Sequence, residues 1–173
     1  MEFKKIKNKI DAFHSEGKTV DAALWLLKKF NLETTNLKGI ELREIAKPDF
    51  ILMTTEGNFG EPQILRLPEN TFEFPLPLML CLLIHEMVHV RQKTVKPYVE
   101  DKNEREWQAY YEMNFHKEFP ETLEISTFHK LFFAKKGLEY YARMGEGSEL
   151  QLKYAEQKKE VELLIDELEV RRF

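Results

Sequence analysis

The chain has 173 residues, and its 43% hydrophobic and 32% charged residues suit one domain with a sizeable core and a well-solvated surface. A net charge of −4 at neutral pH argues against a nucleic-acid partner, because nucleic-acid-binding proteins usually carry a basic surplus. The single cysteine, Cys81, excludes an intrachain disulfide and fits a reducing compartment, and its expected role is that of a small core residue.

The N-terminal region, residues 1–35, has the spacing of two amphipathic helices separated near Gly17. Its lysines are not followed by the continuous apolar segment of a secretory signal. The longest apolar run of the chain, Leu78–Ile84, is too short to span a bilayer. We therefore expect a soluble, cytoplasmic protein with no membrane partner.

Residues 40–68 change to the pattern of a small sheet of about three strands, antiparallel or mixed. The strands are expected from Ile40, at Phe50–Thr55 and at Gln63–Pro68. Prolines at both ends of the last strand favour an edge position for it. An edge strand just before the next helix can accept an extended peptide by backbone pairing, but it is as readily an ordinary short edge strand.

Residues Leu76–Lys93 predict the central helix of the chain, apolar over most of its surface. The helix contains His85-Glu86-Met87-Val88-His89, the pattern H-E-x-x-H. Residues four apart lie above one another on a helix, so His85 and His89 face the same way and can bind one zinc ion. Glu86 is rotated by about 100° from His85. It is therefore expected to act as a general base on a metal-held water rather than as a ligand.

A catalytic zinc normally has a third protein ligand. The metzincin continuation would place glycine and histidine after the motif, but Gln92 and Val95 occupy those positions. The third ligand is then expected from the next helix, where Glu104 and Glu106 compete. Glu104 is the expected capping partner of Asp101 in the first turn. Glu106 lies in the rigid helix interior, which orients a ligand better, so Glu106 is the predicted ligand.

Three further helices are predicted, over residues 101–119, 125–144 and 148–171. The aromatic-rich second one is either continuous or broken at Gly137. The last helix carries an apolar stripe at heptad spacing, formed by Leu150, Tyr154, Gln157, Val161, Leu164 and Leu168. Because this stripe is short for a coiled coil, packing on its own domain is favoured, and the expected state is a monomer or a weak dimer through this helix.

The segment His85-Glu86-x-x-His89 followed by Glu106-Trp107-Gln108-Ala109-Tyr110 resembles the gluzincin metallopeptidases. It is most similar to the small soluble relatives of the prenyl-protein-protease-like zinc peptidases. The resemblance covers residues 76–118 and implies His85, His89 and Glu106 as Zn²⁺ ligands and Glu86 as catalytic base. Tyr110 stands where the family has an aspartate that orients a liganding histidine. Tyr110, Asn114 or a backbone carbonyl is expected in that role.

The expected fold is α+β, a single, mostly helical zincin-like domain over residues 1–173 with a small sheet before the H-E-x-x-H helix. Its parts are N-terminal helices at 1–35, the sheet at 40–68, zinc-site helices at 76–119 and C-terminal helices at 120–173.

The expected function is zinc-dependent hydrolysis of a peptide or protein substrate, in which Glu86 takes a proton from the zinc-bound water and passes it to the leaving amine. A further donor would stabilise the oxyanion. The candidates are Tyr98, Tyr110, Tyr111, Tyr140, Tyr141 and His129, with Tyr110 and Tyr98 retained as site residues. The alternative is a zincin-fold regulatory or protein-binding module with one dedicated partner or no catalytic activity.

Overall fold

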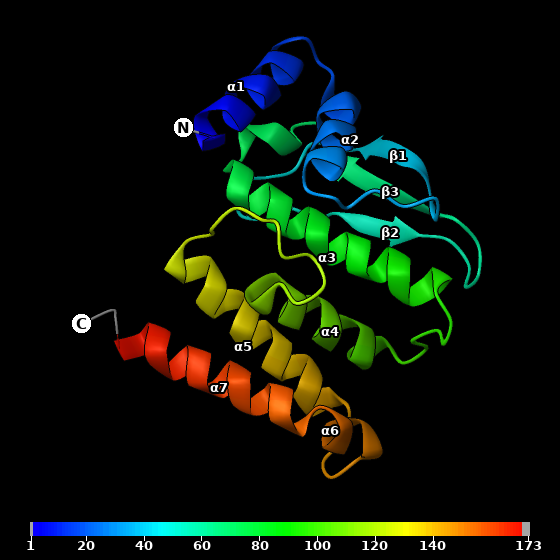
Figure 1. The fold of residues 1–173 in the computed structure, drawn as a ribbon, viewed down its shortest axis with the longest axis vertical. Helices are drawn as coiled ribbons and strands as arrows, with labels where there is room; N and C mark the ends of the chain where they lie inside the picture. Colours follow the sequence, from blue (N-terminus) through cyan, green and yellow to red (C-terminus); the bar gives the residue numbers. More distant parts are fainter. Residues whose placement is uncertain (1, 171–173) are drawn as a thin grey trace.

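The long helix α3 (Leu76–Thr94) crosses the middle of the computed structural model, which describes residues 2–170. The sheet and the N-terminal helices lie on one side of α3, and the C-terminal helices lie on the other (Figure 1). The other elements are, in chain order, α1 (Glu2–Ser15), α2 (Thr19–Lys29), β1 (Leu37–Arg43), β2 (Thr54–Glu56), β3 (Gln63–Pro68), η1 (Thr71–Glu73), α4 (Lys102–Phe115), α5 (Thr127–Arg143), α6 (Glu149–Lys153) and α7 (Ala155–Val170). The expected α+β class, with a three-stranded sheet before α3, is confirmed.

The sheet has the strand order β1-β3-β2, in which β1 is parallel and β2 antiparallel to β3. The predicted edge position of Gln63–Pro68 is therefore wrong, because this strand lies in the centre. Pro68 is tolerated because it is the last residue of the strand. The edge strand beside α3 is β2, and it begins only at Thr54 instead of Phe50.

The described residues form three apolar clusters. Two of them lie on the two sides of α3, and a smaller third one, with Cys81, Met113 and Phe133, joins α3 to α4 and α5. The first packs α1, α2 and the sheet against α3, and its fully buried members include Leu26, Leu65 and Leu83. The second lies between α4, α5 and α7 around Trp107, which is fully buried. Because α3 is covered by the sheet and by α4, its sequence is apolar over most of its circumference instead of along one stripe.

Helix α4 ends at Phe115, four residues before the predicted end at 119. His116 adopts a left-handed backbone conformation with φ of 48°. The buried carboxylate of Glu112 then accepts hydrogen bonds from the backbone N–H groups of residues 117, 118 and 119, at 3.1, 3.0 and 2.8 Å. These bonds satisfy N–H groups that a longer helix would have paired with its own carbonyls.

The C-terminal helices begin within two residues of the predicted positions, and the predicted end of the last helix at 171 lies outside the described residues. Helix α5 is continuous through Gly137, whereas the predicted last helix is divided at Tyr154 into α6 and α7. The apolar stripe faces its own domain: Val161 is buried, and the Trp107 indole N–H donates to Gln157 Oε1 at 3.1 Å. Across residues 2–170, no helix combines the length and the apolar character needed to cross a membrane.

Candidate metal centre

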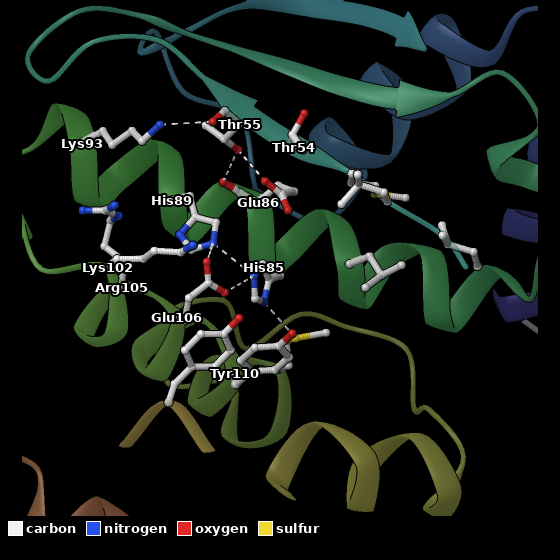
Figure 2. Close-up of a pocket in the computed structure, with 16 residues that line it drawn as sticks. Thr54, Thr55, His85, Glu86, His89, Lys93, Lys102, Arg105, Glu106 and Tyr110 are labelled. Carbon is white, nitrogen blue, oxygen red and sulfur yellow. Dashed lines mark hydrogen bonds and ion pairs between the residues drawn. The ribbon is translucent and has the colours of Figure 1, made fainter. Parts of the chain in front are cut away.

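Three side chains converge between α3 and α4. The Nε2 atoms of His85 and His89 lie 3.0 Å apart. The Glu106 carboxylate lies 3.4 Å from His85 Nε2 through one oxygen and 3.6 Å from His89 Nε2 through the other. Figure 2 shows the three side chains pointing toward one another from the two helices. The structure thus brings together all three predicted ligands.

The spacing of these atoms fits a zinc ion. Tetrahedral zinc with ligand bonds of about 2.0–2.2 Å places neighbouring ligand atoms about 3.3 Å apart. The observed separations of 3.0, 3.4 and 3.6 Å bracket that value. Two imidazole nitrogens and one carboxylate are also a donor set that catalytic zinc sites use, with a fourth position left for water.

Glu86 is the second carboxylate near the imidazoles, and its ligand atoms and those of His85 and His89 lie within 4.8 Å of one another. Its Oε2 atom is 2.8 Å from the hydroxyl of Thr55, which therefore fixes the carboxylate beside β2 (Figure 2). Burial raises the pKa of Glu86 above its usual value, although the charge of His85 and the Thr55 hydrogen bond oppose this shift. A pKa moved toward neutrality suits a general base.

The imidazole of His89 is held by Gln92, one turn further along α3. His89 Nδ1 lies 2.7 Å from Gln92 Oε1, and the Gln92 amide nitrogen donates to the carbonyl of Arg105 and to Gln108 Oε1, each at 2.9 Å. Since these two bonds use the amide N–H groups, the oxygen of Gln92 faces His89 and accepts its Nδ1–H. Burial and the neighbouring His85 lower the pKa of His89 to about 4. The ring is therefore neutral at pH 7, with the Nε2 lone pair directed at the metal position.

The expected partners of the liganding histidines were Tyr110, Asn114 or a backbone carbonyl, and this prediction is wrong. His85 Nδ1 faces the sulfur of Met113 at 3.1 Å. The ring of Tyr110 packs edge-on against the His85 ring, 4.8 Å between centroids, while the Asn114 amide donates to the backbone carbonyl of Tyr110. Tyr110 thus limits the rotation of His85 by packing rather than by accepting its N–H.

Glu104, the alternative third ligand, is turned away from the imidazoles. Its carboxylate accepts hydrogen bonds from Lys153 Nζ at 2.7 Å and from the Tyr154 hydroxyl at 2.6 Å. Of the two hydrogen bonds of the predicted capping pair, one is present: the Asp101 side chain accepts from the backbone N–H of Glu104 at 2.8 Å. The side chain of Glu104 therefore holds the junction of α6 and α7 against α4.

The candidate oxyanion donors fall into two groups. Tyr110 and Tyr140 line a cavity of about 390 Å³ that also contains His85, Glu86 and Glu106. The rings of the two tyrosines stack 5.7 Å apart. The structure therefore brings these two hydroxyl-bearing side chains to the metal centre.

The other candidates have partners elsewhere. Tyr98, a predicted site residue, packs its ring 5.8 Å from Phe59 and is not among the described residues that line the cavity. The remaining hydroxyls and imidazole are bonded as follows: Tyr111 to Glu160, Tyr141 to the carbonyl of Gln151, and His129 to Ser126.

Cys81, one helical turn before His85, behaves as the expected core residue. It is buried, and burial raises the pKa of its thiol to about 12. A protonated, buried thiol is neither a zinc ligand nor a nucleophile.

No family model, curated protein or solved structure matches this chain. Three residues that contact Glu86, His89 and His85 are not among the predicted site residues: Thr55, Gln92 and Met113. Gln92 lies at helical spacing from His89 and could have been found from that spacing.

Proposed function

We propose that the protein is a zinc-dependent metallopeptidase of the gluzincin type, with His85, His89 and Glu106 as ligands. The observation that carries the proposal is the convergence of three ligand atoms at zinc spacing beside a separately held carboxylate, Glu86. Zinc, when bound, would polarise the scissile carbonyl and lower the pKa of a water toward 7.

The chain's own groups supply the proton transfers. Thr55 holds one oxygen of Glu86, so the other oxygen can accept a proton in the cavity and deliver it to the leaving amine. Burial and then the charge of Glu106 raise the pKa of Tyr110, so its hydroxyl keeps its proton at neutral pH. Tyr110 is therefore the side chain best suited to donate a hydrogen bond to an oxyanion.

The edge strand β2 gives a reason for a peptide substrate. Its partner β3 covers one edge, and residues Thr54 and Thr55 line the cavity with Glu86. An extended peptide can add to the other edge by backbone pairing, which would bring its carbonyl groups past the metal centre. This arrangement favours peptide hydrolysis over hydrolysis of a small amide.

The ligand assignment is tested by the zinc content of the purified wild type, Glu106→Gln and the matched control Glu104→Gln. The wild type and the control are expected to hold close to one zinc per chain, and Glu106→Gln much less, because it replaces a carboxylate ligand by a poor one. Unchanged zinc in Glu106→Gln would contradict the assignment, and loss in Glu104→Gln alone would transfer it to Glu104.

The catalytic assignment is tested with a broad peptide library and the zinc-loaded variant Glu86→Gln. Cleavage by the wild type is expected to fall by about 10²–10⁴-fold in the variant while zinc is retained, the typical contribution of a general base. If the zinc-loaded wild type cleaves no peptide, the metallopeptidase proposal fails and a metal-holding binding module takes its place.

A further inference from the structure

Three cationic side chains, Lys93, Lys102 and Arg105, gather at one end of the metal cavity (Figure 2). Lys93 lies one helical turn after His89 on α3, and Lys102 lies one turn before Glu106 on α4. Residues four apart share a helix face, so both lysines lie on the faces that carry the metal ligands. We call Lys93, Lys102 and Arg105 the cationic end of the cleft.

None of these three cations forms an ion pair with a carboxylate in residues 2–170, and the charges of Glu86 and Glu56 act on Lys93 only from farther away. The Lys93 ammonium donates to the carbonyl of Thr55 at 3.1 Å. Arg105 Nη1 donates to the carbonyls of Val99 and Glu100, at 3.0 and 2.7 Å, so neutral acceptors fix the guanidinium in place. Elsewhere in the same two helices, by contrast, a cation does have an acidic partner, as Arg91 has in Glu118.

The two carboxylates in the same cavity do not balance this charge. Glu106 is a proposed metal ligand and Glu86 is the proposed base. A bound divalent ion would add positive charge beside both of them. The chain as a whole carries a net charge of −4, so the cationic end differs in sign from the molecule. A cleft lined by one sign of charge attracts ligands of the opposite sign.

The positions of the cations are also unfavourable without a ligand. Burial and then the charge of Arg105 lower the pKa of Lys93, while the charges of Glu86 and Glu56 act in the opposite direction without cancelling this shift. Lys102 is the first residue of α4, where the positive end of the helix dipole disfavours a cation. An anion bound between these side chains would relieve both effects.

We propose that the cationic end of the cleft binds a carboxylate of the peptide substrate, so that the protein prefers peptides with a negative charge close to the scissile bond. The inference rests on the proposed function and adds a substrate class to it. Lys93 supports the placement because its ammonium group bonds to β2, the strand beside which the peptide would lie. The carboxylate comes either from an acidic side chain or from a free C-terminus, since both offer the same charge and oxygen acceptors.

The test measures binding instead of cleavage, with the zinc-loaded Glu86→Gln variant. Three fluorescent pools of eight-residue peptides are compared by anisotropy. In the first pool one position is always Glu and the C-terminus is amidated. In the second, the neutral pool, the same position is always Gln and the C-terminus is amidated. In the third the position is always Gln and the C-terminus is free. One of the two charged pools is expected to bind about 10-fold more tightly than the neutral pool, with a preference that shrinks at high salt. The pool that binds best identifies the source of the carboxylate.

Substitutions then locate the preference. Lys102→Gln is expected to reduce the preference for the charged pool about 5-fold, the effect of losing one partly exposed ion pair. The matched control is Lys38→Gln, which removes the same charge from exposed β1 at the opposite edge of the sheet. The control should behave like the parent.

Three results would overturn the inference: equal binding of charged and neutral pools, a preference unaffected by Lys102→Gln and Lys93→Gln, or a preference that vanishes on zinc removal alone. The last result would mean that the metal itself binds the carboxylate. Failure of the proposed function is distinguishable, because it appears as absence of cleavage by the wild type while this binding measurement needs no cleavage.

Discussion

Gln92 sets the orientation of His89, one of the three proposed metal ligands. Its oxygen accepts from His89 Nδ1, while its nitrogen is fixed by Arg105 and Gln108 on α4. The residue is almost fully buried, at 5% exposure, so no solvent can substitute for these bonds. A liganding histidine held in this way presents Nε2 in one tautomer and one ring orientation.

We expect Gln92→Ala to weaken zinc binding by about 10- to 100-fold although every ligand remains, because loss of such a partner frees the imidazole to rotate and change tautomer. Competition with a chromophoric chelator measures the change. The matched control Gln157→Ala removes a glutamine that bonds to Trp107 and to none of the three proposed ligands, and should lower stability without altering zinc affinity. Equal zinc affinities for wild type and Gln92→Ala would show that Gln92 has no orienting role.

At the residue scale, what could be predicted depended on local spacing. His85, His89 and Glu106, which the structure brings together, were chosen from their positions on two helices. Gln92 could have been chosen in the same way, because it lies one helical turn after His89. Thr55 and Met113 were not, because they meet Glu86 and His85 across sequence separations of 31 and 28 residues. Such contacts depend on how β2 and α4 pack against α3, and no periodicity in the chain encodes that.

At the scale of elements, the close approach of α4 and α5 depends on Gly137. A Cβ atom at this position would lie 3.3 Å from Tyr110 Cβ and 3.7 Å from the Trp107 ring. Both neighbours belong to the helix that carries Glu106. The glycine therefore allows α5 to pack closely against α4, the helix that carries the proposed ligand Glu106.

We predict that Gly137→Val destabilises the protein by about 1–3 kcal/mol, the usual cost of overpacking, and also weakens zinc binding because α4 must move. Chemical denaturation measures the first effect and chelator competition the second. Gly137→Ala should be much milder, since one methyl at 3.3 Å is partly offset by a gain in helix propensity of about 1 kcal/mol. A valine variant as stable as the wild type would mean that the two helices separate at little cost.

The turn that ends α4 carries a second element-scale prediction. Burial and then the charge of Lys130 lower the pKa of His116 below its ordinary value of 6.5, and no described residue accepts a hydrogen bond at its Nδ1. The unfolded chain therefore binds a proton more readily than the folded one. The stability associated with neutral His116 is complete above pH 6.5 and is lost as the pH falls through the folded pKa.

As the pH is lowered from 7.5 to below the folded-state pKa of His116, the metal-free wild type should therefore lose more stability than His116→Asn. Asparagine tolerates the left-handed backbone and cannot titrate, and all other titratable groups are common to both proteins. Urea denaturation at a series of pH values measures the difference. Parallel pH profiles for the two proteins would contradict a buried, neutral imidazole at this turn.

The order of the strands shows why element positions were harder to predict than element types. Prolines 62 and 68 predicted an edge for the last strand, yet Leu65 and Leu67 within it are fully buried and the strand is central. A proline at a strand end breaks no ladder bond, so it carries no information about the strand's neighbours. The break at Tyr154 was likewise missed: the hydroxyl of this residue bonds to Glu104 on α4, a contact that the heptad spacing does not indicate.

At the scale of the whole molecule, the proposed metal centre lies where the two halves meet. His85 and His89 stand on α3, which packs into the first apolar cluster, and Glu106 stands on α4, which packs into the second. Direct packing of α3 against α4 already joins the halves. A metal held by ligands from both helices would add a cross-link between them, and the free energy of metal binding would then contribute to folding of the whole chain.

Zinc is therefore expected to stabilise the entire protein and not only its own site. A ligand present at about 1,000 times its Kd stabilises the folded state by about 4 kcal/mol, equivalent to a rise in Tm of about 10 °C for a chain of this size. Thermal unfolding with zinc and with a chelator measures the shift, and Glu106→Gln should lose most of it because the variant retains ligands from one half only. Hydrogen exchange distinguishes a cross-link from a local effect: zinc should slow exchange in α4 and α5 as well as in α3. Slowing confined to α3 in both wild type and Glu106→Gln would mean that the metal does not join the two halves.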